Sequence, residues 1–404
     1  MKPDALLKGP GIRMRCEYFG ALAWRAQPRR IYRLDKAAAA VLLLHYQPRP
    51  ADAPVPPIAP LGLDDKDWHR AMAELRRQGL IVPTEDTSAA VTPEDVRVAQ
   101  HALETDTPKC PVLKPLWAHI QPFTRCNQHC IHCYCHGGPK ADPFLLPVDT
   151  WLSIVGTLDD YGVLDVYVTG GESLLYDGFF TIAEEILSRG MGFGVSTNAT
   201  VLSERTLARL RDLRLETIQV SLDGAHAARH EFIRGAPGSF QRTLDGIARI
   251  SEFSSPLINT VVNRQNMDEL EEVVKLGLEH GCTSFKFFPQ KPVGRSGAAP
   301  TLSDDEILDQ LIPECAGLSS AYDVEIETID PAKPCGSGSI GFALDQHGDI
   351  YPCIFGVADP AQRCGNILSD KLSDVWFGSP TLEKFRGEVN TPCRRCEARH
   401  QLRR

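Results

Sequence analysis

Short apolar runs alternate with longer amphipathic stretches between residues 114 and 300. The apolar runs, each a predicted strand, lie at 117–121, 165–169, 192–196, 217–222, 257–262 and 284–289. The amphipathic stretches, each a predicted helix, lie at 149–161, 178–189, 203–212, 238–252 and 266–280. Alternation of this kind is typical of βαβ units, so we expect an α/β fold built on a parallel sheet. In such folds ligands gather at the carboxyl ends of the strands.

The N-terminal part has a different pattern. Residues 16–33 alternate short apolar and polar pieces and predict two or three strands, which a helix over 35–45 follows. A proline-rich stretch at 48–60 separates them from a second predicted helix at 68–78, and residues 80–82 begin another strand. Strands with two small helices in such a short segment predict a winged-helix-like α+β module.

Composition narrows the class of protein. The 404 residues include 43 Lys and Arg against 52 Asp and Glu, and the net charge of −9 argues against broad nucleic-acid binding. The first residues lack the apolar core of a secretory signal, and the longest apolar run, at 37–44, is too short to cross a bilayer. Thirteen cysteines without an export signal indicate metal or redox chemistry in a reducing compartment. We therefore expect a cytoplasmic protein without membrane or nucleic-acid partners.

Three cysteines follow the first predicted strand of the parallel sheet at C-x3-C-x2-C spacing: Cys126, Cys130 and Cys133. A loop of this length can place three thiolates around one face of an iron–sulfur cube. A 4Fe–4S cluster that only carries electrons takes four protein ligands, so three ligands leave one iron open for a small molecule. The alternative is a zinc knuckle, but zinc usually takes paired C-x2-C elements that complete a tetrahedron.

The spacing resembles the signature of the radical S-adenosylmethionine (radical SAM) enzymes. The resemblance implies that the open iron chelates SAM and that the reduced cluster cleaves SAM to a 5′-deoxyadenosyl radical, which abstracts hydrogen from a substrate. It also implies that the six strands form the open, partial (β/α)6 barrel of that family.

Further motifs end the next predicted strands, and the resemblance gives each a role. Gly170, Gly171 and Glu172 resemble the family's GGE motif, whose glycines allow a close backbone approach and whose carboxylate takes the SAM ammonium group. The remaining residues expected to contact SAM are His132 and Tyr134 near adenine, Ser196 and Asn198 near ribose, Ser221 and Arg234 near the carboxylate, and Asp223 beside them. For Asp223 a turn-capping role is the alternative, and for Tyr134 it is packing.

The C-terminal segment carries a second group of cysteines. Cys335 and Cys353 flank Gly348 in a C-x12-G-x4-C pattern with a predicted hairpin, and Cys393 and Cys396 form a C-x2-C pair. This pattern resembles the SPASM and twitch extensions of radical SAM enzymes. Because no cysteine follows Cys396, we expect the twitch type, in which these four thiolates hold one auxiliary 4Fe–4S cluster. Structural zinc is the alternative.

The other cysteines have less defined roles. Cys364 is a candidate replacement ligand for the auxiliary cluster or a hydrogen-atom donor, as a lone cysteine is in some radical SAM peptide epimerases. Cys135 is a weaker candidate donor. Buried packing thiols are the expectation for the remaining four: Cys16, Cys110, Cys282 and Cys315.

The N-terminal module resembles the peptide-binding element of enzymes that modify ribosomally made peptides, in which a leader peptide adds a strand to a sheet edge. A winged helix used for dimerisation or packing is the alternative for this module. We therefore expect a precursor peptide as partner, an external reductant such as flavodoxin or ferredoxin, and crosslinking, thioether formation or epimerisation as the outcome. A small substrate such as an amino sugar or tetrapyrrole is one alternative, and a zinc-stapled, non-catalytic binding protein is another. The expected domains are 1–90 for peptide recognition, 91–113 for a linker, 114–300 for the barrel and 301–404 for the auxiliary cluster.

Overall fold

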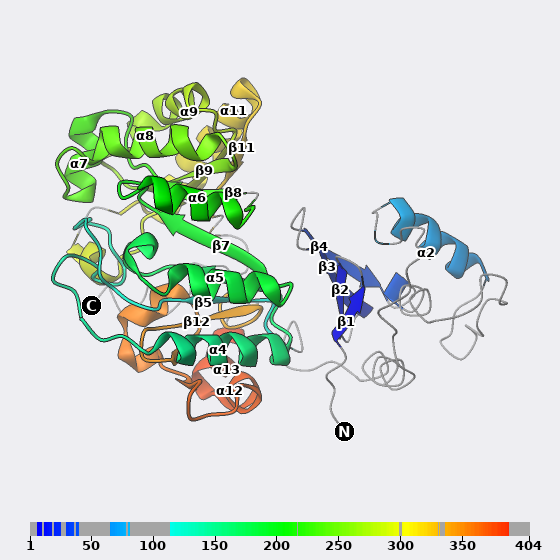
Figure 1. Ribbon diagram of the computed structural model, residues 1–404. Coiled ribbons are helices and arrows are strands. Elements are labelled where there is room, and N and C mark those ends of the chain that lie inside the picture. The colour runs from blue at the N-terminus through cyan, green and yellow to red at the C-terminus, as the bar shows by residue number, and fades with distance from the viewer. Residues whose placement is uncertain are drawn as a thin grey trace. The chain divides into compact units, whose positions relative to one another are not determined.

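The computed structural model describes the segments 6–9, 12–17, 20–25, 30–35, 38–39, 65–77, 114–215, 217–298, 301–329 and 336–387, together with residues 80 and 331. The chain divides into two compact units. The first consists of 1–116 with the short pieces 159–164 and 190–192, and the second contains the rest. Figure 1 shows the elements of both.

The N-terminal unit contains a four-stranded antiparallel sheet whose strands follow one another in chain order: β1 (Leu6–Gly9), β2 (Ile12–Glu17), β3 (Gly20–Arg25) and β4 (Arg30–Asp35). Residues 16–33 contain the end of β2, all of β3 and most of β4, so the expected strands are confirmed, whereas β1 and the start of β2 precede that range and were missed. Helix α2 (Asp65–Arg77) confirms the second predicted helix. Of the first predicted helix only residues 38 and 39 are described, and they are helical. The proline-rich stretch and residues 81–82 lie outside the described residues.

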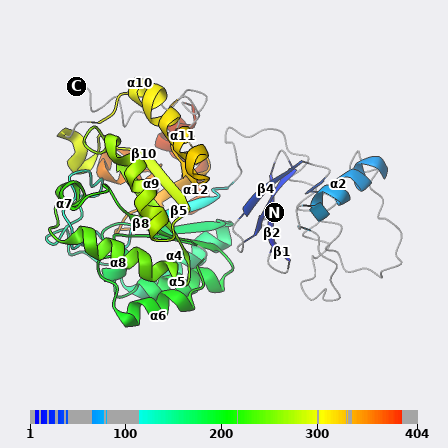
Figure 2. The same cartoon turned by 90° about the horizontal axis from the view of Figure 1, so that it is seen from above.

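The second unit contains the parallel sheet that the alternating pattern predicts. Its strands are β5 (Trp117–Ile120), β6 (Asp165–Val168), β7 (Gly192–Thr197), β8 (Thr217–Ser221), β9 (Ser255–Val262) and β10 (Ser284–Pro289), hydrogen-bonded to one another in chain order. The helices between them are α4 (Val148–Tyr161), α5 (Phe179–Ser188), α6 (Glu204–Asp212), α7 (Ala227–Arg234), α8 (Ser239–Ser251) and α9 (Leu270–Glu279). Helices α4, α5, α6 and α8 follow one another along the sheet (Figures 1 and 2). The partial (β/α)6 barrel is thus confirmed.

The core is built from every second side chain of the strands together with the buried faces of the helices. Every second residue of β9 is buried from Pro256 onwards, and Trp151 of α4 and Phe179 of α5 are among the largest fully buried side chains. The sequence pattern missed helix α7, which precedes the expected α8. Helix α7 ends at Gly235, whose φ of 56° is a left-handed conformation that favours glycine.

The C-terminal part extends the parallel sheet at both edges. Helical turns α10 (Asp304–Glu306) and η5 (Ile307–Leu311) and helix α11 (Ile312–Tyr322) lead into β11 (Glu325–Glu327), which pairs in parallel with β10. The predicted hairpin is confirmed as β12 (Gly341–Leu344) and β13 (Asp349–Tyr351), with Gly348 at a φ of 78° in the turn.

The hairpin does not stand alone, because β12 pairs in parallel with β5. A Cβ on Gly341 would lie 2.2 Å from the Trp117 ring, so this close approach requires glycine. The segment ends with η6 (Ile354–Ala358), η7 (Pro360–Gln362), β14 (Gly365–Asn366), α12 (Leu372–Gly378) and α13 (Pro380–Gly387). None of the helices in the described residues is long and apolar enough to cross a membrane.

Candidate functional site

The loop after β5 carries the three cysteines and is fixed by backbone hydrogen bonds to the end of α7. The His129 amide donates to the carbonyl of Arg234 over 3.1 Å, and the Ile131 amide donates to Ile233 over 2.9 Å. A Cβ on Gly235 would lie 2.5 Å from the His129 carbonyl oxygen. The left-handed glycine that ends α7 therefore also allows this helix to lie directly against the cysteine loop.

The glycines of the GGE motif have a role that the sequence did not indicate. The Gly171 amide donates to Phe123 over 3.0 Å, and the Glu172 amide donates to Arg125 over 2.9 Å. A Cβ on Gly171 would lie 1.8 Å from the Arg125 oxygen, and one on Gly170, whose φ is 121°, would lie 2.3 Å from the Phe123 oxygen. Because these two glycines have no side chains, the β6 loop can hydrogen-bond to the cysteine loop. We had expected the same two glycines to allow a ligand to approach the backbone.

The carboxylate of Glu172 is buried, with 2% of the residue exposed. It accepts hydrogen bonds from the Thr197 hydroxyl at 2.6 Å, the Asn198 amide at 2.7 Å and the Leu174 amide at 3.2 Å. Burial raises its pKa above the ordinary value, although these donors lower it. A buried carboxylate that three neutral donors hold in place is suited to pair with a cation such as an ammonium group.

Asp223 joins two of the predicted SAM contacts. Its Oδ2 lies 2.7 Å from Nε2 of His132 and 2.7 Å from Nε of Arg234, and all three side chains are almost fully buried. Burial alone would raise the pKa of Asp223, but the charge of Arg234 and the charge and hydrogen bond of His132 together hold it well below its usual range. Asp223 is therefore a structural anion that orients an imidazole and a guanidinium, as well as accepting the Val261 amide at 2.9 Å.

Arg234 faces the cysteine loop with part of its hydrogen-bonding capacity unused. Its Nη1 lies 3.7 Å from the sulfur of Cys130, a contact that would become charge-assisted if this thiol ionised to bind iron. Its Nη2 is buried without a hydrogen-bond partner among the described residues. An unpaired buried guanidinium nitrogen beside a thiol is a site for a carboxylate.

The three thiols differ in their ease of ionisation. Burial raises the pKa of Cys126 to about 12 and also raises that of Cys130, although the charge of Arg234 lowers the latter. The sulfurs of Cys133 and Cys135 lie 3.7 Å apart, and the hydrogen bond from Cys135 lowers the pKa of Cys133 to about 5. Cys135 thus supports the thiolate form of its neighbour, and its own pKa is raised.

Two other predicted contacts belong to hydrogen-bonded groups at the ends of β7 and β8. The Asn198 side chain donates to Asn127 over 2.8 Å and accepts from Thr200, so it links β7 to the cysteine loop. The Ser196 hydroxyl accepts from Gln219 over 2.8 Å. Their roles toward a ribose stay predictions, as does that of Ser221, which is half-buried at the end of β8.

Tyr134 packs against neighbouring side chains, which is the alternative role predicted for it. Its hydroxyl is 3.1 Å from that of Thr169, and its ring meets Phe355 edge-on at 5.7 Å. Phe355 belongs to η6, so this ring pair connects the cysteine loop to the C-terminal segment. A role beside adenine stays a prediction for Tyr134.

Two buried or half-buried residues of this site were absent from the sequence reasoning. His230 of α7 is fully buried, and its Nδ1 accepts the Asp223 amide over 3.3 Å. Arg295, more than 150 positions further along the chain, donates to two carbonyls of the cysteine loop. His230 was not predicted because helix α7 was not predicted. Arg295 was not predicted because no local sequence pattern connects it to the cysteines.

Comparison with known proteins agrees with this geometry. The sequence profile of the radical SAM superfamily matches residues 120–277, and that of the SPASM iron–sulfur cluster-binding domain matches residues 335–397. The chain thus contains a radical SAM domain, followed by a SPASM iron–sulfur cluster-binding domain.

Relatives of this radical SAM protein include the mycofactocin maturase MftC of Mycolicibacterium smegmatis, 28% identical over 65% of this chain and 70% of the relative. Another is the AdoMet-dependent heme synthase of Methanosarcina barkeri, 26% identical over 67% and 85% respectively. Among solved structures, Streptococcus suis SuiB bound to its precursor peptide SuiA has a TM-score of 0.74 with 18% identity, covering 95% of this chain and 90% of that one.

The residues of this radical SAM protein fit the cofactors that its family implies. The three cysteines at C-x3-C-x2-C spacing, a buried carboxylate and an unpaired buried guanidinium nitrogen match a site-open 4Fe–4S cluster with SAM beside it. No group of three His, Cys, Asp or Glu side chains in the described residues is placed to hold one metal ion. In an iron–sulfur cluster each thiolate binds its own iron, so no such convergence is required.

The auxiliary segment of the radical SAM protein is described only in part. Cys353 and Cys364 are half-buried, whereas Cys335, Cys393 and Cys396 lie outside the described residues. Burial, with a smaller contribution from the negative charge of Cys353, raises the pKa of Cys364 to about 12, although Ser379 and Arg386 lower it. Among the expected packing thiols, Cys282 and Cys315 are buried; the side chain of Cys16 and the whole of Cys110 lie outside the description.

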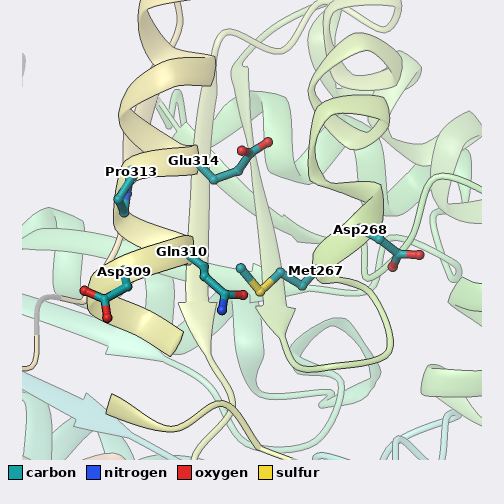
Figure 3. A pocket seen from close by; sticks show the side chains of 6 residues that line it. All are labelled: Met267, Asp268, Asp309, Gln310, Pro313 and Glu314. Atoms are coloured by element: carbon teal, nitrogen blue, oxygen red, sulfur yellow. The ribbon is translucent and has the colours of Figure 1, made fainter. Parts of the chain in front are cut away.

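A pocket of about 510 Å³ lies apart from these motifs, between η3 (Met267–Glu269) and the η5–α11 helix (Figure 3). Its lining residues are Met267, Asp268, Asp309, Gln310, Pro313 and Glu314. The side chains of Met267 and Gln310 approach each other across it (Figure 3). None of the lining residues belongs to the cysteine loop or to a strand-end motif, so the pocket is not part of the candidate active site.

Proposed function

We propose that this radical SAM enzyme modifies a residue of a ribosomally made precursor peptide by hydrogen abstraction. When bound at the three-cysteine loop, the cluster and SAM supply a strongly oxidising carbon radical. The chain's own residues bind SAM, orient it, exclude water and hold the peptide.

The geometry supports a specific division of labour at the SAM site. Glu172 is held by three hydrogen bonds and takes the SAM ammonium group, and the free Nη2 of Arg234 takes its carboxylate. Asp223 keeps Arg234 and His132 in place. Because Nε2 of His132 is occupied by Asp223, the imidazole contacts adenine with its ring face or its opposite edge in this proposal. Ser196, Asn198, Ser221 and Tyr134 complete the pocket in this proposal.

The N-terminal sheet supports a peptide substrate. Its outer strands β1 and β4 pair with β2 and β3 only, as far as the described residues extend. An outer strand offers unpaired amides and carbonyls to which an extended leader peptide can add as a further strand. The observation that carries the proposal is the match to the SuiB fold over 95% of the chain, which extends beyond the barrel to this unit.

The C-terminal segment is proposed to hold one auxiliary 4Fe–4S cluster through Cys335, Cys353, Cys393 and Cys396. Such a cluster would supply a one-electron acceptor, which is the chemistry that formation of a crosslink or thioether requires. Cys364 lies close enough to Cys353 to interact with it electrostatically, and it is a candidate replacement ligand for this cluster. If Cys364 instead returns a hydrogen atom to the substrate, the reaction is an epimerisation. The first electron comes from an external reductant such as flavodoxin or ferredoxin in the cytoplasm.

The test is an anaerobic reaction of the reconstituted enzyme with SAM, dithionite and a precursor peptide encoded beside it. We expect 5′-deoxyadenosine together with a peptide that has lost two hydrogens, or that has gained one deuterium from D₂O without bond formation. The same peptide without its leader is the matched control, and it should react much more slowly. Formation of 5′-deoxyadenosine without any change in the peptide would contradict the peptide substrate.

One observation favours a second candidate. The heme synthase relative is matched over 85% of its length, and heme, the product for which it is named, is a tetrapyrrole. The rival function is oxidation of a tetrapyrrole or another small molecule. Spectral titration with iron-coproporphyrin and with the precursor peptide, each in the presence of SAM, separates the two: the ligand that binds tightly and is consumed identifies the class.

A further inference from the structure

The turn after β10 is far from the cysteine loop in sequence but contacts it in the folded chain. It forms η4 (Gly294–Ala298), and its residue Arg295 makes three hydrogen bonds to the loop. The amide donates to the carbonyl of Cys133 over 3.0 Å. The side chain donates through Nε to the carbonyl of Cys130 over 2.8 Å and through Nη2 to that of Gly137 over 2.6 Å.

The neighbours of Arg295 are shaped for this contact. Gly294 has a φ of 62°, and a Cβ on it would lie 2.3 Å from the Tyr134 carbonyl oxygen and 2.5 Å from that of Cys133. Only glycine allows the turn to approach so closely. The Ser296 hydroxyl accepts from the Val293 amide over 3.1 Å and donates back to the Val293 carbonyl, which fixes the turn from within.

The guanidinium of Arg295 differs from that of Arg234 in its electrostatic surroundings. Arg234 is neutralised by Asp223 at 2.7 Å. The side-chain hydrogen bonds of Arg295 go to neutral carbonyls, and no carboxylate of the described residues pairs with it. Its positive charge is therefore uncompensated by any carboxylate of the described residues, and it lies beside Cys130 and Cys133, which become thiolates when they bind iron.

We propose that Arg295 is a positioning residue for the barrel cluster, with two effects. Its fork joins the middle of the cysteine loop, at Cys130, to its end, at Gly137, and so holds the loop ready for the cluster. Its charge favours the reduced form, because the reduced cluster is more negative and surrounding charge tunes the reduction potential. The inference rests on the cluster at this loop and not on the identity of the substrate.

The test compares Arg295→Gln, which removes the charge, with Arg295→Lys, which keeps the charge but not the fork. Arg264→Gln is the matched control, because Arg264 is an exposed arginine that pairs with Glu306. Each protein is reconstituted anaerobically with the cysteines of the auxiliary segment replaced by alanine, so that only the barrel cluster is read. The readouts are iron per chain, iron loss to a chelator, and the midpoint potential from an EPR-monitored titration.

We expect Arg295→Gln to lower the ratio of reduced to oxidised cluster roughly tenfold at a fixed potential, which is about 59 mV toward more negative values for one electron. Arg295→Lys should keep the wild-type potential within about threefold in that ratio but lose iron to the chelator several-fold faster. Arg264→Gln should match the wild type. Equal potentials in all four proteins would refute the charge effect, and unchanged iron loss in both Arg295 variants would refute the positioning role.

A wild-type protein that binds no iron at this loop would overturn both the proposed function and this inference. A wild-type protein that binds iron and cleaves SAM, with Arg295 variants that behave identically to it, would overturn the inference alone. Thermal unfolding of each iron-free protein checks that the substitutions do not act through general instability.

Discussion

Replacement of Gly171 by alanine should displace the cysteine loop where it meets the β6 loop. The added Cβ would lie 1.8 Å from the Arg125 oxygen, whereas real contacts stay above 3.0 Å, so the backbone must move by more than about 1 Å. Such a shift breaks the bonds from Gly171 to Phe123 and from Glu172 to Arg125. Two backbone hydrogen bonds contribute about 2 kcal/mol together, and overpacking costs a further 1–3 kcal/mol or so.

The expected loss of about 3–5 kcal/mol falls on the loop rather than on the whole unit, since the clash involves only backbone next to the cysteines. Anaerobic iron content and the yield of 5′-deoxyadenosine should therefore drop at least tenfold in Gly171→Ala. The helical content in far-UV circular dichroism should be retained.

Gly317→Ala is the matched control. A Cβ on Gly317, in helix α11, would meet nothing within 4 Å. This substitution should be neutral or stabilise by about 0.5–1 kcal/mol, because alanine favours the helix. If Gly171→Ala retained wild-type iron content and activity, the inferred backbone contact between the β6 loop and the cysteine loop would be wrong.

Four further outcomes are expected. Glu172→Gln should weaken SAM binding at least about tenfold in calorimetry, because a neutral amide loses the attraction to the ammonium group; unchanged affinity would remove Glu172 from the site. Asp223→Asn should cost about 3–5 kcal/mol of unfolding free energy in urea, since it leaves a buried cation unpaired, whereas the exposed control Asp245→Asn should change little. Burial lowers the pKa of His230 from 6.5 to about 4, so its neutral form stabilises the fold above pH 6.5 and this contribution is lost as the pH falls toward 4; His230→Gln should flatten that part of the stability–pH curve. Cys353→Ala should reduce the iron content from about eight to about four per chain while SAM cleavage persists; complete loss of iron would show that the two cysteine groups do not hold separate clusters.

The local pattern of the sequence determined the parallel strands and most of the helices. Period-two burial and helical spacing are properties of neighbouring residues, so the strands from Trp117 to Pro289 were placed to within two residues. The cysteine spacing and the strand-end motifs also came from local sequence, because a ligand loop and a tight turn each fit in a few residues. These features were enough to indicate the superfamily and its cofactors.

Contacts between distant segments were decided only by the tertiary structure. The pairing of β12 with β5 and the bonds from Arg295 to the cysteine loop join residues more than 150 positions apart, and no local pattern encodes such partners. The glycines of the GGE motif belong here too: the sequence indicates that side chains are excluded, but only the packed barrel shows that the Arg125 backbone is what excludes them. The physical reason is that propensity and spacing act over a few residues, whereas burial, ion pairing and close backbone approach depend on which surfaces the folded chain brings together.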